Sequence, residues 1–138
     1  MADLPVSLNY ALDNENRLKA SKIYDQEVLS WISKFYEICS PSRIFINSGT
    51  EADLEYIRMK ALSEREELPT HNKLQTIHFD GVRDQARDRE HTHIVSESKI
   101  EGVNYADKRQ AIDEVMSLLR GIMKGREMLV GFYSLGPK

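Results

Sequence analysis

Apolar residues recur at steps of three and four in three stretches of the chain, which is the spacing of an amphipathic α-helix. The pattern predicts helices over residues 25–39, 51–64 and 107–123. We expect these apolar side chains, with the aromatic residues of the first helix among them, to face the core. In chain order they are Val28, Trp31, Ile32, Phe35, Tyr36 and Cys39; Leu54, Ile57, Ala61 and Leu62; and Ala111, Ile112, Val115, Met116, Leu119, Ile122 and Met123.

Local signals predict where these helices begin and end. Pro41 disfavours helical geometry in the residue before it, so the first helix is expected to stop near residue 39. Thr50, followed three residues later by Asp53, resembles a capping box and indicates the start of the second helix. Gly125 accepts the left-handed conformation at little cost, and we expect it to end the third helix.

Short β-prone stretches lie between and after the helices. They predict strands at residues 43–47, 74–79 and 92–96, and a buried strand in "EMLVGFYSLG", residues 127–136. The first strand, a glycine turn and the second helix together indicate half of a strand–helix–strand unit. No repeat or Gly/Ser linker divides the sequence. We therefore predict a mixed α/β (α+β) fold, one domain over residues 1–138, with three or more helices packed on a small mixed β-sheet.

Composition narrows the class of protein. The chain has 138 residues, of which 41% are hydrophobic and 30% charged, and a formal net charge of −3. This composition is typical of a soluble globular domain, and the absence of a basic stripe argues against a nucleic-acid binder. Cys39 is the single cysteine, so no intrachain disulfide can form, and we expect it in the core. Without a signal-peptide pattern or an apolar run of roughly 20 residues, the sequence predicts a cytoplasmic protein with no membrane partner.

One charged stretch, "RDQARDREHT" at residues 83–92, contains the first candidate functional residue. Arg87 follows a predicted strand and precedes another, and a guanidinium group there can bind a carboxylate or a phosphate through two hydrogen bonds. The alternative is a surface arginine that pairs with Asp84 or Asp88, because exposed ion pairs are common and weak. Spacing alone favours the surface ion pair.

Other candidate sites have structural alternatives too. His91 and His93 would face the same side of a strand, and together with His78 they could form a three-histidine metal site, or they are polar residues on an exposed strand face. The segment "GIMKG" lacks the spacing of a phosphate-binding loop and follows a helix, so a helix C-cap is the better interpretation. The sequence thus assigns no metal or cofactor site to this chain.

Two segments together resemble a known family. "QARDREHTHIV" is similar to a segment of GTP-dependent phosphoenolpyruvate carboxykinases that reads A-R, four residues, T and an apolar strand. "IMKGREMLVGFYSLGP" resembles that family's later helix-to-strand segment, and "CSPSRIFI" resembles its archaeal branch in particular. The resemblance spans residues 28–138. The positions that match the two patterns are Ala86, Arg87, Thr92, Ile94 and Val95, and Met123, Lys124, Gly125, Arg126, Met128, Val130, Gly136 and Pro137.

The resemblance implies the N-terminal domain of an enzyme of gluconeogenesis, a lyase that converts oxaloacetate and GTP to phosphoenolpyruvate, GDP and CO2. It implies that Arg87 binds a carboxylate of oxaloacetate or phosphoenolpyruvate, while Lys124 and Arg126 help to shape the domain. The complete enzyme would use GTP and Mn2+ or Mg2+, but the family's nucleotide loop, metal ligands and reactive loop lie beyond the segment that matches. We therefore expect a truncated chain that lacks the C-terminal catalytic domain and is inactive alone.

A second hypothesis is a stand-alone binding module that has the fold without the catalysis. Its apolar C-terminal strand would offer an edge for pairing with a second copy, so this hypothesis predicts a homodimer.

Overall fold

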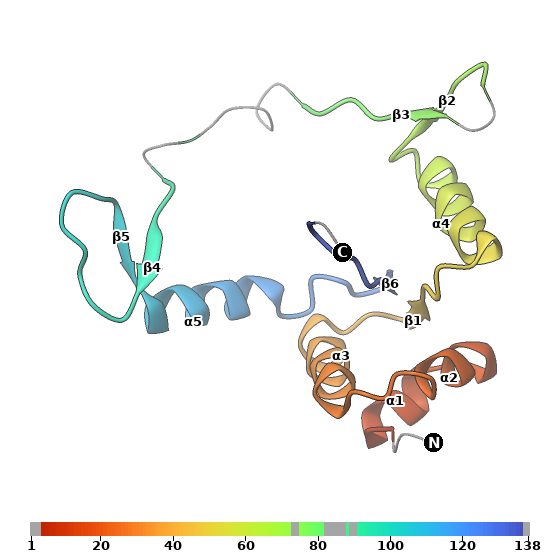
Figure 1. Ribbon diagram of the computed structural model, residues 1–138, viewed down its shortest axis with the longest axis horizontal. Coiled ribbons are helices and arrows are strands. Elements are labelled where there is room, and N and C mark those ends of the chain that lie inside the picture. The colour runs from red at the N-terminus through yellow and green to blue at the C-terminus, as the bar shows by residue number, and fades with distance from the viewer. Residues whose placement is uncertain (1–3, 73–74, 82–87, 89–90, 137–138) are drawn as a thin grey trace. The chain divides into compact units, whose positions relative to one another are not determined.

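The computed structural model describes residues 4–72, 75–81, 88 and 91–136. Its helices and strands confirm the predicted mixed α/β class (Figure 1). Within the described residues the strands form three two-stranded sheets. The helices are α1 (Val6–Ala11), α2 (Asn14–Ala20), α3 (Gln26–Cys39), α4 (Glu51–Ser63) and α5 (Lys108–Leu119), and the strands are β1 (Arg43–Ile46), β2 (Leu68–Pro69), β3 (Thr76–Ile77), β4 (Ile94–Ser96), β5 (Tyr105–Asp107) and β6 (Glu127–Val130).

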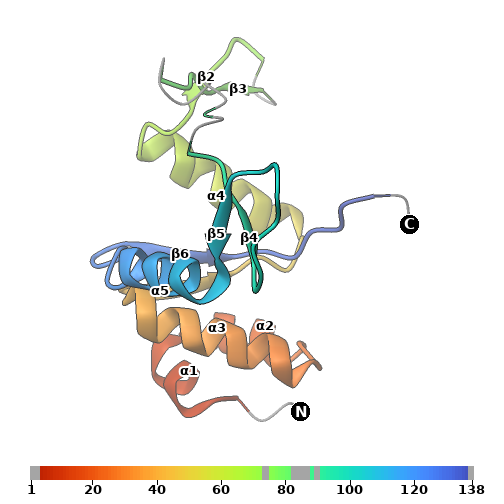
Figure 2. The same ribbon diagram turned by 90° about the vertical axis from the view of Figure 1, so that its left-hand side faces the viewer.

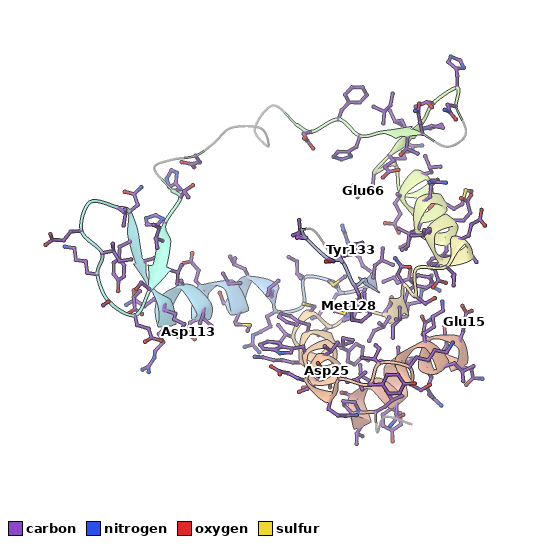
Figure 3. The ribbon with its side chains drawn as sticks, viewed as in Figure 1. Glu15, Asp25, Glu66, Asp113, Met128 and Tyr133 are labelled. Atoms are coloured by element: carbon purple, nitrogen blue, oxygen red, sulfur yellow. The ribbon has the colours of Figure 1, made fainter. Side chains whose placement is uncertain are left out.

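The chain forms two compact units, residues 1–49 with 112–138 and residues 50–111. The first unit contains the hydrophobic core, to which α1, α2, α3, β1 and β6 contribute. Figure 2 shows α1 and α3 side by side, and the two helices are in contact. Cys39 is buried among these side chains, as predicted. The core residues are Leu8, Leu12, Ala20, Leu29, Ile32, Cys39, Ile44, Ile46 and Met128 (Met128 is labelled in Figure 3).

Strands β1 and β6 pair in parallel, with Arg43 opposite Glu127 and Ile46 opposite Val130. Backbone hydrogen bonds from Ser42 to the carbonyl of Arg126 and from Asn47 to that of Val130, both 2.8 Å, extend the ladder at its two ends. Arg43 Nε also lies 2.6 Å from the Glu127 carboxylate, whose side chain is only 5% exposed, so an ion pair reinforces this register. Strand β1 is followed by α4, as the sequence indicated, but β2, the next described strand, pairs with β3 and not with β1, so the predicted strand–helix–strand unit is not completed there.

The predicted starts of two helices are confirmed by their caps. The Asp25 carboxylate accepts hydrogen bonds from the backbone N–H groups of Glu27 and Val28 at the start of α3. The Thr50 hydroxyl accepts one from Asp53 N–H at the start of α4. Helix α3 ends at Cys39 as predicted, and Ser40, which precedes Pro41, takes the left-handed conformation with φ of 54°.

The predicted end of the third helix is wrong. Helix α5 stops at Leu119, not near residue 123, and Gly125 lies in the turn that follows. The reason is Gly121, whose φ of +70° leaves the helical region four residues earlier. The following backbone caps another helix: the N–H groups of Gly121 and Met123 donate to the carbonyls of Ile38 and Cys39 at the end of α3.

Several side chains predicted for the core are exposed in the described structure. Trp31 is 46% exposed, because α3 turns Leu29, Ile32 and Ser33 toward α1 and leaves the indole to stack on the Phe35 ring. Leu54 is 51% exposed, since the apolar residues of α4 are spread around the helix and form no single stripe. Of the predicted third stripe, Ile112 and Val115 in α5 and Ile122 in the turn after it are also exposed, whereas Leu119 and Met123 pack against the core.

The sequence pattern also predicted strands that are longer than those observed, and it did not predict α1 and α2. Strand β3 covers only Thr76–Ile77, β4 only Ile94–Ser96, and β6 ends at Val130. Helices α1 and α2 have six and seven residues, which is too short for a helical period to stand out from the sequence.

Candidate functional site

The candidate substrate-binding residue, Arg87, lies outside the described residues, and so does Asp84, one of its two proposed ion-pair partners. The structure does describe the residues on either side. Before the arginine it describes β3 and residues 78–81, and after it Asp88 and the chain from His91 into β4. These flanking residues all belong to the second unit.

Before the arginine, His78 joins the two ends of the β2–β3 hairpin. Its Nδ1 lies 2.5 Å from the backbone carbonyl oxygen of Glu66, which precedes β2 and is labelled in Figure 3. Its Nε2 lies 3.1 Å from the carboxylate of Asp80, which follows β3. A carbonyl and a carboxylate both accept hydrogen bonds, so this geometry suits an imidazolium that donates from both nitrogens. The Glu66 carbonyl raises the pKa of His78 most, burial partly opposes the shift, and the Asp80 carboxylate adds to it.

After the arginine, Asp88 contacts two residues that precede β4. Its Oδ1 accepts a 3.0 Å hydrogen bond from the backbone N–H of His91, and its Oδ2 lies 2.5 Å from Nδ1 of the same histidine. The hydroxyl of Thr92 donates to the backbone carbonyl of Asp88. Both the side chain and the carbonyl of Asp88 are thus held by residues three and four positions later.

The chain from His91 leads directly into regular structure. Strand β4 pairs in parallel with β5, and the Ile94 N–H donates to the Asn104 carbonyl at 2.8 Å at the start of the pair. At the other end, the Asp107 carboxylate accepts hydrogen bonds of 3.0 Å from the N–H groups of Arg109 and Gln110 in the first turn of α5. The chain from His91 therefore runs into a strand pair that is continuous with a capped helix.

The three histidines do not form the metal site considered from the sequence. His78 and His91 each contact a different aspartate, and His93 Nδ1 lies 3.0 Å from the backbone carbonyl of His91. Among the residues that the structure describes, no three His, Cys, Asp or Glu side chains are grouped so as to hold a metal ion. In the same part of the chain, no helix is long and apolar enough to cross a membrane.

Two further candidates have structural roles. The "GIMKG" segment caps α3 with its backbone, and its Lys124 N–H donates to the Gly121 carbonyl at 3.1 Å. The carbonyl of Arg126 accepts from both the N–H and the hydroxyl of Ser42, each at 2.8 Å, where β1 and β6 begin. Both contacts are made by the backbone of Lys124 and Arg126, so the role expected of their side chains stays a prediction.

The sequence analysis missed the contacts of His78 and Asp88. The sequence does carry a signal for the contacts of Asp88. An aspartate three residues before a backbone donor has the spacing of a helix cap, and the threonine one residue after that donor is a natural side-chain donor. The contact of His78 with Glu66 carried no such signal, because twelve residues separate the partners.

Comparison with known proteins assigns the chain to a protein family. The family model for the phosphoenolpyruvate carboxykinase N-terminal domain matches residues 30–138. This chain therefore belongs to the family of phosphoenolpyruvate carboxykinase N-terminal domains. The match includes the charged stretch and the later helix-to-strand segment that carried the resemblance in the sequence.

Particular relatives agree with that assignment. The chain is 46% identical over 131 residues to the phosphoenolpyruvate carboxykinase [GTP] of Sulfurisphaera tokodaii, and 39% identical over 131 residues to that of Saccharolobus solfataricus. It is 35% identical over 133 residues to the enzyme of the same name from Thermococcus sibiricus. Each alignment covers 95% of this chain but only 21–22% of the relative, so the chain spans about a fifth of the length of these enzymes.

Proposed function

We propose that this chain is the N-terminal, substrate-binding part of a cytoplasmic GTP-dependent phosphoenolpyruvate carboxykinase, in which residues 1–138 act as one domain. The complete enzyme would convert oxaloacetate and GTP to phosphoenolpyruvate, GDP and CO2, a step of gluconeogenesis. The observation that carries the proposal is the family match over residues 30–138, together with relatives named for this activity. In this proposal its partner is a catalytic domain, and the relatives extend well beyond the segment that this chain matches.

Within this chain, we assign the substrate contact to Arg87. Its planar guanidinium group can hold a carboxylate of oxaloacetate or phosphoenolpyruvate through two parallel hydrogen bonds, which fixes orientation as well as position. Orientation matters because phosphoryl transfer depends largely on how the reacting groups are placed. Support comes from the order of the motif: the Thr92 hydroxyl donates to the Asp88 carbonyl just ahead of β4, and Ile94 and Val95 lie in that strand.

The described residues do not fit the metal ions that the family implies, since they contain no suitable group of ligands. We therefore derive no step of the reaction through a metal or GTP in this chain. In the proposal, other parts of the complete enzyme bind GTP and Mn2+ or Mg2+, and this chain contributes the carboxylate contact and its supporting backbone. Alone, the 138 residues are expected to show no GTP-dependent turnover of oxaloacetate.

A chimera tests the proposal. The segment of the Sulfurisphaera tokodaii enzyme that aligns with this chain would be replaced by residues 1–138, and GTP-dependent turnover of oxaloacetate would be followed in a coupled assay. The proposal predicts activity in the chimera and none in the isolated chain. A folded chimera without activity, or turnover by the isolated chain, would contradict it.

The alternative is a stand-alone binding module that pairs through β6. Among the described strands β6 pairs only with β1, and Leu129, Phe132 and Tyr133 in and after it are exposed. Light scattering on the purified chain tests this alternative, because a monomer would exclude strand pairing between copies.

A further inference from the structure

The outer edge of strand β1 is covered by helix α2 of the same unit. The Asn16 side-chain oxygen accepts a 2.7 Å hydrogen bond from the Ile46 N–H, and α2 is in contact with β1. The Lys19 ammonium group lies 4.5 Å from the centre of the Phe45 ring, so a second side chain of α2 covers the same strand. This edge of the β1–β6 sheet is therefore already occupied.

The opposite edge of the sheet, on β6, is open. The Asn47 N–H donates to the Val130 carbonyl at 2.8 Å, so the backbone polar groups of Val130 point toward β1. Within a strand these groups alternate sides from one residue to the next, so those of Leu129 point away from β1. In the part of the chain that the structure describes, β6 pairs with no strand other than β1. The Leu129 N–H and carbonyl are therefore placed to pair with a further strand.

Strand β6 also lacks side chains that protect a free edge. Proteins often place lysine, proline or an unpaired charge on such a strand. The sequence of β6, Glu127–Val130, contains no lysine or proline, and its one carboxylate is 5% exposed and paired with Arg43. Leu129 is 41% exposed and Phe132, just after the strand, is 54% exposed. The edge is thus apolar and suited to being covered.

We propose that the open edge of β6 accepts a β-strand from the part of the complete enzyme that lies outside residues 1–138. The aligned segment makes up only 21–22% of the relatives, so most of such an enzyme lies elsewhere in the same polypeptide. A strand that is covalently linked to β6 has a high effective concentration, which a second copy of the chain lacks. The inference rests on the proposed function and names the surface through which this domain joins its partner.

Hydrogen exchange at single amides tests this without any assay of activity. It compares the isolated 138-residue chain with the chimera described above. The Leu129 amide should exchange rapidly in the isolated chain and about a hundredfold or more slowly in the chimera, where the new strand accepts its hydrogen bond. The Val130 amide is the matched control, because it faces β1 and should be protected in both proteins.

Two results would overturn the inference. One is a folded chimera in which the Leu129 amide exchanges as fast as in the isolated chain; if that chimera turns over oxaloacetate, the proposed function still stands. The other is an isolated chain that dimerises and protects Leu129 as its concentration rises, which would assign the edge to a second copy. A chimera that protects Leu129 but lacks activity would support the inference and contradict the proposed function.

A proline substitution gives a second, independent readout. Proline is tolerated on an edge strand where the lost N–H faces solvent, but not where that N–H joins two strands. Leu129→Pro should therefore lower the unfolding midpoint of the chimera by several degrees more than that of the isolated chain. Val130→Pro, which removes a donor to β1, should destabilise both proteins. Equal shifts for Leu129→Pro in the two proteins would contradict a paired edge in the complete enzyme.

Discussion

The side-chain oxygen of Asn16 accepts a 2.7 Å hydrogen bond from the backbone N–H of Ile46 in the interior of the first unit. Asn16 is only 5% exposed, and its amide nitrogen donates to the Asp13 carboxylate at 3.0 Å. Because Ile46 is the last residue of β1, this bond joins helix α2 to that strand. The bond also gives the buried Ile46 N–H a hydrogen-bond acceptor, which it would otherwise lack.

Replacing Asn16 by alanine should therefore destabilise the first unit. The Ile46 N–H would lose its partner while still buried, which costs about 2 kcal/mol of unfolding free energy. Urea denaturation measures the loss, and Asn14→Ala is the matched control because Asn14 is exposed on the same helix. Equal stability of the two variants would show that this hydrogen bond contributes nothing.

Asp25 is expected to stabilise α3 through its cap. Its carboxylate accepts from the N–H of Glu27 at 2.9 Å and from that of Val28 at 3.4 Å. Asp25→Ala should lower the free energy of unfolding by about 1 kcal/mol, and Asp25→Ser, which keeps a capping oxygen, should recover most of it. Thermal unfolding of the three proteins measures the difference; the same midpoint for alanine and aspartate would contradict the role of the cap.

The contacts of His78 predict a pH dependence in the second unit. The Glu66 carbonyl, and to a smaller degree the Asp80 carboxylate, raise the pKa of His78 above its ordinary value, although burial opposes them. A raised pKa in the folded state means that the contact contributes stability fully below the unfolded-state pKa of histidine. That contribution is lost as the pH rises through the folded-state pKa.

NMR titration of the His78 ring protons tests this directly. We expect a pKa above the ordinary value in the parent, and a lower pKa in Asp80→Asn, where the negative charge is removed. A parent His78 that titrates at or below the ordinary value would show that the imidazole does not bridge Glu66 and Asp80 in solution.

Helix ends were predictable where local signals agreed with the apolar pattern. Pro41 and the Thr50 cap place the end of α3 and the start of α4 within one residue of the prediction. The end of α5 was missed because two glycines compete for the same role, and the pattern cannot say that Gly121 takes the left-handed conformation first.

Burial and the site were harder to predict. An apolar stripe shows which face of a helix is hydrophobic, but not which part of that face a neighbour covers, so Trp31 was assigned to the core and is half-exposed. Arg87 was singled out by a family resemblance and not by spacing, because a charged surface segment has the same composition whether or not one of its arginines binds a ligand.

One kinetic comparison decides whether Arg87 binds the substrate carboxylate in the complete enzyme. In the chimera, kcat/KM for oxaloacetate would be measured for Arg87→Ala beside Arg83→Ala and Arg89→Ala, which remove nearby arginines that have no match in the family pattern. Losing a bidentate, charge-assisted contact should cost about 2–4 kcal/mol of transition-state binding, a fall of roughly 30- to 1,000-fold for Arg87→Ala alone. An unchanged kcat/KM for Arg87→Ala, or equal losses in all three variants, would contradict the assignment.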